Sequence, residues 1–163
     1  MSEASEAIDT SKENILYIDI EAGRIEILMR PDVAPNHVAR IKELARQGFY
    51  EGVIFHRVIP GFMAQGGDPT GTGTSGSGQN LKAEFSRLPH LRGTVSMARA
   101  ETDDSADSQF FIVLDRTPFL DDKYTVWGRV IKGMEFVEMI APGEPPANPT
   151  KILKVQVAAD VDK

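Results

Sequence analysis

The chain has 163 residues, of which 41% are hydrophobic and 26% charged, a composition typical of one globular domain with a sizeable buried core. Its 24 acidic residues outnumber the 18 basic ones, and the net charge of −6 argues against nucleic-acid or anionic-membrane partners held by bulk charge. The chain has no cysteine, which excludes disulfides, thiolate nucleophiles and cysteine-ligated zinc or iron–sulfur sites.

The first 13 residues are polar and acidic, and we expect them to form a disordered tail ahead of a single domain over residues 14–163. This segment lacks the apolar stretch of a secretory signal, and no run of 18 apolar residues occurs in the sequence. We therefore expect a cytoplasmic protein with no membrane partner. We also expect it to be a monomer.

The predicted elements begin with a β-hairpin. Apolar residues alternate with other residues over residues 15–20 and 24–29, and a Glu-Ala-Gly turn separates the two runs. After this hairpin the spacing of the apolar residues changes to that of a helix. Pro35 suits a first helical turn, Gly48 can end the helix, and one face carries Val38, Ile41, Leu44 and Ala45.

Short apolar or aromatic runs follow, each bounded by Gly, Pro, Asp or Thr. They predict strands within residues 53–59, 62–65, 95–98, 109–114 and 124–131. A second short helix fits residues 134–140, and a closing strand fits residues 153–157. Seven or eight short strands and two helices, without regular βαβ alternation, favour an antiparallel barrel or sandwich with attached helices.

The glycine-rich stretch over residues 66–78 contains a G-x-G-x-x-G spacing at Gly71, Gly73 and Gly76. No amphipathic helix follows that could offer its N-terminus to a pyrophosphate, and no Gly-Lys-Ser/Thr follows as in a P-loop. We interpret this stretch as an irregular surface loop.

No metal site or cofactor is predicted. The acidic cluster of Asp103, Asp104 and Asp107 lacks the glycine and glutamate positions of a calcium-binding EF-hand loop. The three histidines lie far apart in the sequence without ligand spacing, so we expect each to be a surface or packing residue.

Strand alternation gives two predictions about side-chain faces. In residues 55–59 it places Arg57 on the face opposite to His56 and Val58. In residues 109–114 it separates Gln109, Phe111 and Val113 from a core-facing set of Phe110, Ile112 and Leu114. The pattern alone leaves open whether Arg57 is functional or simply a solvated charge on the sheet.

Four segments resemble one known family. FHRVIPGFMAQGGD at residues 55–68 closely resembles the signature of the cyclophilin-type peptidyl-prolyl cis–trans isomerases. SMARA (96–100), SQFFIVL (108–114) and FLDDKYTVWGRV (119–130) resemble later blocks of that family, in the same order. The resemblance implies a mainly β fold, a closed eight-stranded antiparallel β-barrel capped by two α-helices. It also implies isomerisation of Xaa-Pro bonds in polypeptides, without a cofactor, in assistance of protein folding.

The resemblance implies the site residues as well. Arg57 matches the catalytic arginine of the family, and Gln65 and Phe111 complete the predicted catalytic set. The predicted substrate-binding residues are Phe62, Met63, Ala98, Arg99, Gln109, Phe119, Leu120 and Tyr124.

Three of these positions depart from the best-known eukaryotic members and resemble bacterial ones. Phe119 stands where those members carry Trp, Tyr124 where they carry His, and Arg99 where they carry Asn. Because Phe119 lacks an indole N–H, cyclosporin is expected to bind weakly.

Two other functions compete with catalysis. One is a binding module that holds proline-containing peptides with little turnover, and the presence of Arg57 argues against it because binding alone needs no arginine there. The other is a barrel with a small apolar ligand inside. The large core-facing residues of the segment 109–114 can fill a small barrel themselves, which disfavours that function.

Overall fold

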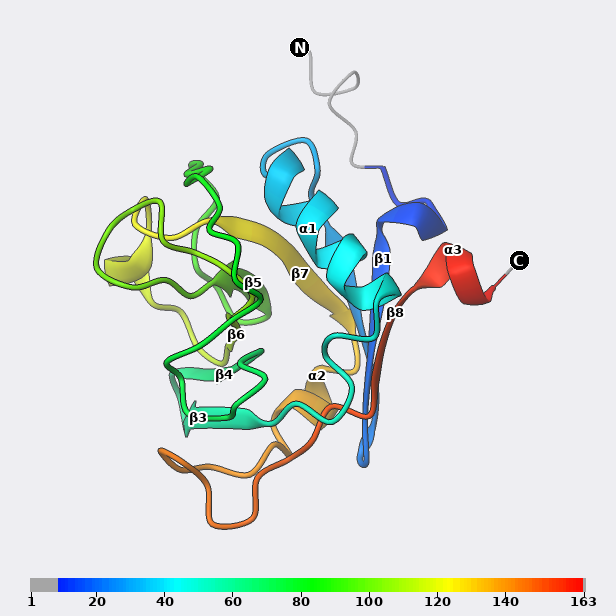
Figure 1. The fold of residues 1–163 in the computed structure, drawn as a ribbon, viewed down its shortest axis with the longest axis vertical. Coiled ribbons are helices and arrows are strands. Elements are labelled where there is room, and N and C mark those ends of the chain that lie inside the picture. The colour runs from blue at the N-terminus through cyan, green and yellow to red at the C-terminus, as the bar shows by residue number, and fades with distance from the viewer. Residues whose placement is uncertain (1–8, 163) are drawn as a thin grey trace.

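One curled antiparallel sheet of eight strands organises the structure, a computed structural model that describes residues 9–162 (Figure 1). In the sheet the strands follow the order β3-β4-β6-β5-β7-β2-β1-β8. Their bounds are β1 Ile15–Ile20, β2 Gly23–Met29, β3 Phe55–Ile59, β4 Met63–Gly66, β5 Thr94–Met97, β6 Phe110–Val113, β7 Val126–Lys132 and β8 Lys154–Val157. The predicted hairpin is confirmed as β1 and β2, with Ile20 opposite Gly23 at the turn.

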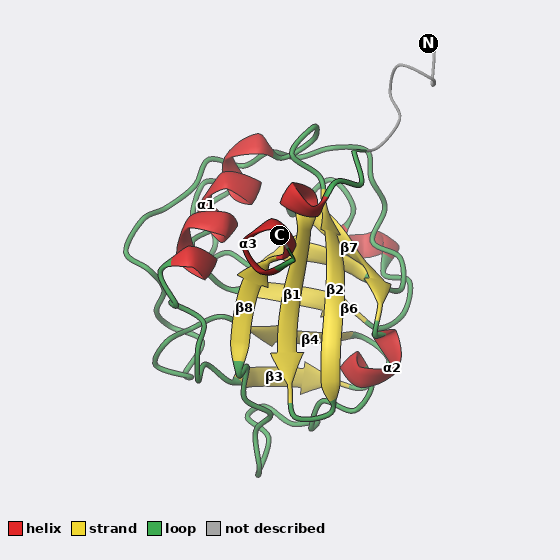
Figure 2. Cartoon of the chain, turned by 90° about the vertical axis from the view of Figure 1, so that its right-hand side faces the viewer, coloured by secondary structure: helices red, strands yellow, loops and turns green. Residues whose placement is uncertain are grey.

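The prediction of a closed barrel is wrong, because the sheet is open. β3 and β8 are its two edge strands, and Figure 2 shows them running in steeply crossing directions. The chain just before each of them makes one isolated bridge, Ile54 to Lys151. Strands that cross in this way meet over one or two residues only, so no ladder forms between them.

Three α-helices flank the sheet, where two were expected: α1 (Pro35–Arg46), α2 (Met134–Val137) and α3 (Ala158–Val161). The predicted first helix is confirmed by α1, and Gly48 follows it with a left-handed φ of 72°. α2 is shorter than predicted, and α3 was missed because four residues carry too little periodic signal. Within residues 9–162, no helix has the length and apolar character needed to cross a bilayer.

The predicted tail over residues 1–13 lies partly outside the described residues, which begin at Asp9. Its end is not a free tail, since Lys12–Asn14 forms the 3₁₀ helix η2. Glu13 also pairs with two cations of α1, Lys42 at 2.9 Å and Arg46 at 3.2 Å. These contacts tie the chain to α1 before residue 14.

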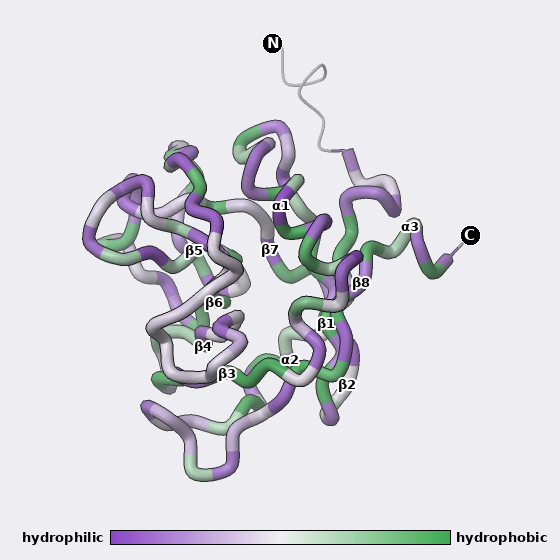
Figure 3. Tube along the Cα trace, in the orientation of Figure 1, coloured by the Kyte–Doolittle hydropathy of each residue, from purple (hydrophilic) through white to green (hydrophobic). Residues whose placement is uncertain are grey.

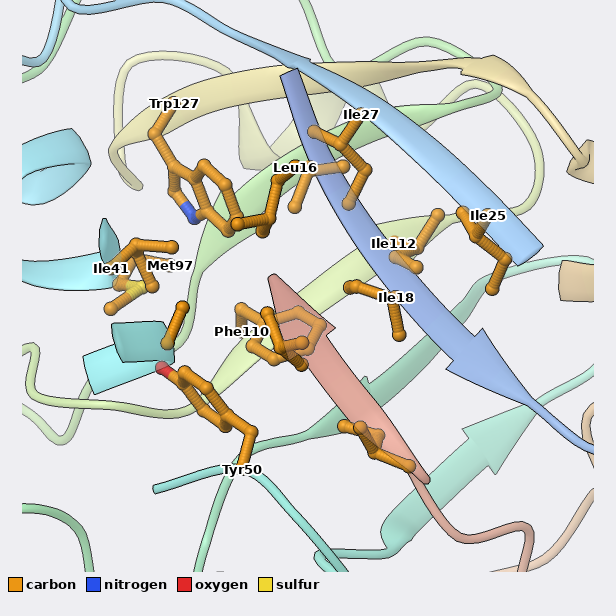
Figure 4. Packing of buried hydrophobic residues seen from close by; sticks show 14 of the residues in the cluster. Leu16, Ile18, Ile25, Ile27, Ile41, Tyr50, Met97, Phe110, Ile112 and Trp127 are labelled. Carbon is orange, nitrogen blue, oxygen red and sulfur yellow. The ribbon is translucent and has the colours of Figure 1, made fainter. Parts of the chain in front are cut away.

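Hydrophobic residues, green in Figure 3, recur along the strands and along α1. The buried ones form two clusters. The larger cluster lies inside the curl of the sheet, where Phe110 packs near Tyr50 and Trp127 (Figure 4). The smaller cluster consists of Met63, Phe111, Val113 and Leu120. Phe110 and Phe111 therefore lie on opposite faces of β6, as strand alternation predicts.

Candidate active site

Arg57 reaches solvent from an edge strand whose neighbouring residues are buried. The register of β3 against β4 shifts between Phe55 and Arg57, and Arg57 then pairs with Gln65. His56 and Val58 are buried, whereas the Arg57 side chain is 45% exposed. Val58 belongs to the larger core cluster, so the predicted face of Arg57 is confirmed relative to Val58. Phe55, two residues before Arg57, lies in the same core, so the bulge interrupts strict alternation between Phe55 and Arg57.

A pocket of about 130 Å³ opens beside Arg57. Its other lining residues are Phe62, Met63, Gln65, Ala98, Arg99, Phe111, Leu120 and Tyr124. All of them belong to the predicted site, so the structure brings together residues from four separate segments of the chain. Pockets for drug-sized ligands usually measure about 300–1,000 Å³, so a space of about 130 Å³ suits a single small ring.

Two predicted residues lie outside this pocket. Phe119, on the 3₁₀ helix η3 (Pro118–Leu120), is 61% exposed and its ring centroid lies 5.7 Å from that of Phe62. It forms a rim above the pocket wall. Gln109 lines a neighbouring cavity of about 410 Å³, which shares Gln65, Ala98 and Arg99 with the pocket.

A chain of amide hydrogen bonds connects the pocket to the glycine-rich loop. Gln65 Nε2 donates to Gln109 Oε1 at 3.0 Å, and Gln109 Nε2 donates to the Ser75 carbonyl at 2.9 Å. Both glutamines are therefore oriented by the fold, one from β4 and one from the start of β6. Such fixed amides can pair with the backbone of an extended peptide.

In the glycine-rich loop, backbone N–H groups bind the carboxylates of two aspartates. In a nucleotide-binding loop such N–H groups would bind phosphate. Three backbone N–H groups donate to Asp68 at 2.7–3.0 Å, from Thr70, Gly73 and Ser75. Three more donate to Asp107 at 2.8–3.2 Å, from Ser77, Gly78 and Gln79. The two aspartates shape the wall of the larger cavity, a role that the sequence analysis missed.

Acidification should weaken the Asp68 anchor. Burial alone would raise the pKa of Asp68, but hydrogen bonds from Thr70, Ser75 and Gly73 outweigh it and hold this pKa below its ordinary value. Such a group stabilises the fold fully above its unfolded-state pKa of about 3.9, and this contribution is lost as the pH falls further.

The Asp68→Asn variant should therefore be less stable at neutral pH by roughly 1–3 kcal/mol. Its thermal midpoint should also fall less steeply than that of the wild type between about pH 5 and pH 3. Scanning calorimetry at several pH values checks both statements. Parallel curves for the two proteins would contradict the role given to Asp68.

Arg99 also lines the pocket, and its guanidinium N–H groups already donate hydrogen bonds to backbone carbonyls. Its Nε–H donates to the Lys123 carbonyl at 3.0 Å, and its Nη1 donates to the carbonyls of Ala100 and Glu101 at 3.1 and 3.2 Å. Its guanidinium also lies 4.8 Å from the centroid of the Tyr124 ring. The side chain thus fixes the pocket wall on the Tyr124 side.

Sequence reasoning also missed the support beneath Phe111. The buried ring of His90 stacks on Phe111 with 6.0 Å between centroids and an interplanar angle of 16°. Its nitrogens lie 3.0 Å from Asp121 Oδ1 and 3.0 Å from Ser96 Oγ. Burial lowers the pKa of His90, and the Asp121 hydrogen bond opposes that shift only in part.

Within residues 9–162, no group of three or more His, Asp or Glu side chains is placed so that it could bind a metal ion.

Comparison with solved structures defines the class of protein to which this fold and site belong. A cyclophilin from Hirschia baltica, AquaCyp293, is similar with a TM-score of 0.87 at 30% identity, over 93% of this chain and 76% of that one. A cyclophilin-type isomerase from Cryptosporidium parvum, solved in the presence of the dipeptide Ala-Pro, has a TM-score of 0.82 at 29% identity. That likeness covers 88% of this chain and 98% of the other.

Sequence comparison shows the family. Residues 15–157 match the family described as "Cyclophilin type peptidyl-prolyl cis-trans isomerase/CLD". A probable peptidyl-prolyl cis–trans isomerase of Brucella suis is 47% identical over 91% of this chain and 84% of its own length. Peptidyl-prolyl cis–trans isomerase B of Bacillus subtilis is 46% identical, over 78% of this chain and 91% of its own. The chain belongs to the cyclophilin-type peptidyl-prolyl cis–trans isomerases and is an isomerase of Xaa-Pro peptide bonds.

Proposed function

We propose that the pocket beside Arg57 holds the substrate proline and that Arg57 is the catalytic residue. Amide resonance opposes rotation about Xaa-Pro with a barrier of about 18–20 kcal/mol. In the transition state this resonance is lost, and the prolyl nitrogen becomes pyramidal and regains a lone pair. A guanidinium N–H can donate to that localised lone pair. In the planar ground state the lone pair is delocalised into the carbonyl group, so the interaction favours the transition state.

One observation carries this assignment. Two arginines line the pocket, and the terminal nitrogens of Arg99 are engaged by Ala100, Glu101 and Asp103. Arg57 makes a single hydrogen bond to a described residue, through Nε, and its terminal N–H groups donate to none of the residues 9–162. Arg57 is therefore the lining cation with donors free for a substrate.

The apolar wall contributes by fixing the ring and excluding water, which strengthens the Arg57 interaction. Phe62, Met63, Phe111 and Leu120 supply that wall. Raising a rate of about 10⁻² s⁻¹ to about 10³ s⁻¹ needs roughly 7 kcal/mol of differential stabilisation. In the proposal, Gln65 and Gln109 pair with the peptide backbone beside the pocket.

Titration with an Ala-Pro peptide tests the proposed site. Amide resonances of the pocket segments at Phe62–Met63, Ala98 and Phe111 should shift, and those of a surface strand such as β8 should stay unchanged. Exchange between the cis and trans forms of the bound peptide should appear in the same spectra. Shifts confined to other parts of the surface would place the active centre elsewhere.

Cyclosporin is proposed to inhibit weakly, since Phe119 provides ring area at the pocket rim but no hydrogen-bond donor. Trp127 cannot replace the missing indole because it is fully buried. One absent hydrogen bond lowers affinity by about tenfold. The Phe119→Trp variant should therefore be inhibited at about tenfold lower drug concentration, with little change in kcat/KM. Equal, tight inhibition of both proteins would contradict this.

Other parts of the proposal rest on the sequence alone. Assistance to protein folding, a monomeric state, a cytoplasmic location, and the absence of nucleic-acid and membrane partners stay predictions. So does the domain organisation, in which an acidic segment precedes one isomerase domain. Separation by size together with light scattering measures the oligomeric state directly.

A further inference from the structure

A carboxylate from a distant loop contacts the proposed catalytic arginine. Arg57 Nε donates to Glu144 Oε1 at 2.8 Å, although the two residues are 87 positions apart in the chain. The Glu144 side chain is 54% exposed. It takes one of the five N–H donors of the guanidinium and leaves the four terminal ones free of hydrogen bonds to residues 9–162.

Backbone hydrogen bonds hold the loop that carries Glu144 next to β3. The position of Glu144 near Arg57 is therefore set by the backbone and not by the two side chains alone. Val58 and Gly143 exchange two hydrogen bonds, each 2.9 Å long, and so form an isolated antiparallel bridge. Val58 follows Arg57 directly, and Glu144 follows Gly143. In Figure 1 this loop, coloured orange, lies next to β3.

Gly143 makes the tight turn of this loop possible. Its φ is +138°, and a Cβ there would lie 2.6 Å from Pro146 Cα and 2.9 Å from the Pro145 carbonyl oxygen. Both contacts are with backbone atoms, which cannot move aside cheaply. A third hydrogen bond fixes the base of the loop, from Ala141 N to Thr150 Oγ1 at 3.0 Å.

We propose that Glu144 is a positioning residue for the isomerase reaction, one that holds the Arg57 guanidinium with its terminal N–H groups directed to the substrate. The inference rests on the proposed catalytic role of Arg57. A half-exposed arginine otherwise samples many rotamers, and each rotamer that misses the prolyl nitrogen is unproductive. A hydrogen bond at Nε restricts those rotamers and leaves the donors at the far end of the fork unoccupied.

The variants Glu144→Ala and Glu144→Gln separate positioning from other roles. Glu144→Ala should lower kcat/KM about fivefold and leave the affinity for an Ala-Pro peptide nearly unchanged, because the pocket walls are intact. Glu144→Gln keeps an acceptor oxygen at the same distance along the side chain, so it should retain most of the activity. Equal losses in both variants, or higher activity in Glu144→Ala, would overturn the proposal.

A matched control is available at another exposed arginine–glutamate pair, Arg92 with Glu138. Glu138→Gln should leave kcat/KM unchanged. The ¹⁵N resonance of Arg57 Nε, assigned by its disappearance in Arg57→Lys, should shift in Glu144→Ala and stay in place in Glu138→Gln. An unshifted resonance in Glu144→Ala would show that the contact does not exist in solution and would overturn the proposal.

A double-mutant cycle distinguishes this inference from the proposed function. If Glu144 acts through Arg57, adding Glu144→Ala to Arg57→Ala should cause no further loss of activity. An additive loss would overturn the positioning role. Full activity in Arg57→Ala would instead overturn the catalytic assignment of Arg57 itself. An inactive Arg57→Ala together with a fully active Glu144→Ala would overturn the positioning role of Glu144 alone.

Discussion

Replacing Arg57 by alanine should lower kcat/KM by about a hundredfold or more while the fold stays intact. Removing a preorganised donor that acts at the transition state costs roughly that factor in well-studied enzymes. The fold should survive because the Arg57 side chain is 45% exposed and its ion pair with Glu144 lies at the surface. Exposed pairs of this kind contribute about 0–1 kcal/mol to stability.

A protease-coupled assay on an Ala-Pro peptide measures the activity, and circular dichroism with thermal unfolding measures the fold. Arg129→Ala on β7 is a suitable control, since Arg129 is exposed and does not line the pocket. It should leave both quantities nearly unchanged. If Arg57→Ala kept wild-type kcat/KM with an unchanged spectrum, the mechanism proposed for this site would be wrong.

Replacing Phe110 by alanine should destabilise the protein by about 3–5 kcal/mol. The ring is 2% exposed and makes edge-to-face contacts with Tyr50, Phe55 and Trp127 at 5.7–6.1 Å. No neighbour can fill so central a cavity without strain. Because Phe110 faces away from the pocket, the molecules that remain folded should keep most of their activity.

Phe111→Ala, on the adjacent residue, should show the opposite balance. Phe111 is also buried, at 4% exposure, but it belongs to the small cluster under the pocket and contacts His90 and Tyr124. We expect a clear loss of kcat/KM and a stability loss smaller than that of Phe110→Ala. Thermal midpoints and activities of the two variants, measured side by side, decide this. A larger stability loss from Phe111→Ala would reverse the assignment of the two faces.

Strand alternation predicted these faces correctly because the side-chain period of a strand is a local property. The opposite faces of Phe110 and Phe111, and of Arg57 and Val58, follow from it without knowledge of the tertiary structure, whereas the bulge between Phe55 and Arg57 does not. The wall of the pocket required the resemblance to a family, since Met63, Ala98 and Leu120 carry no chemical signature of their own. In the structure, however, they meet around one cavity.

The residues that sequence reasoning missed act through contacts between distant segments. Glu144 reaches Arg57 across 87 positions, and nothing in the proline-rich segment marks its carboxylate as different from any other surface acid. His90 supports Phe111 from 21 positions away in the chain. Asp68 had a weak local signal, an aspartate two residues before a threonine, which is typical of an Asx turn. Closure of the sheet was mispredicted because it was taken from the resemblance to the family, and the spacing of apolar residues, which left a barrel and a sandwich open, does not encode strand direction in space.

The proline-rich loop also affects how the protein meets other chains. β3 is an edge strand, and edge strands offer unpaired backbone groups on which a foreign segment can add as a further strand. The segment bridged to that edge at Val58 carries Pro145, Pro146 and Pro149, none of which has a backbone N–H to continue a ladder. An isomerase of Xaa-Pro bonds meets other polypeptide chains, and some of their segments are extended and apolar. With this edge covered, an extended segment that meets the protein finds fewer unpaired backbone groups of β3 on which a further strand could add.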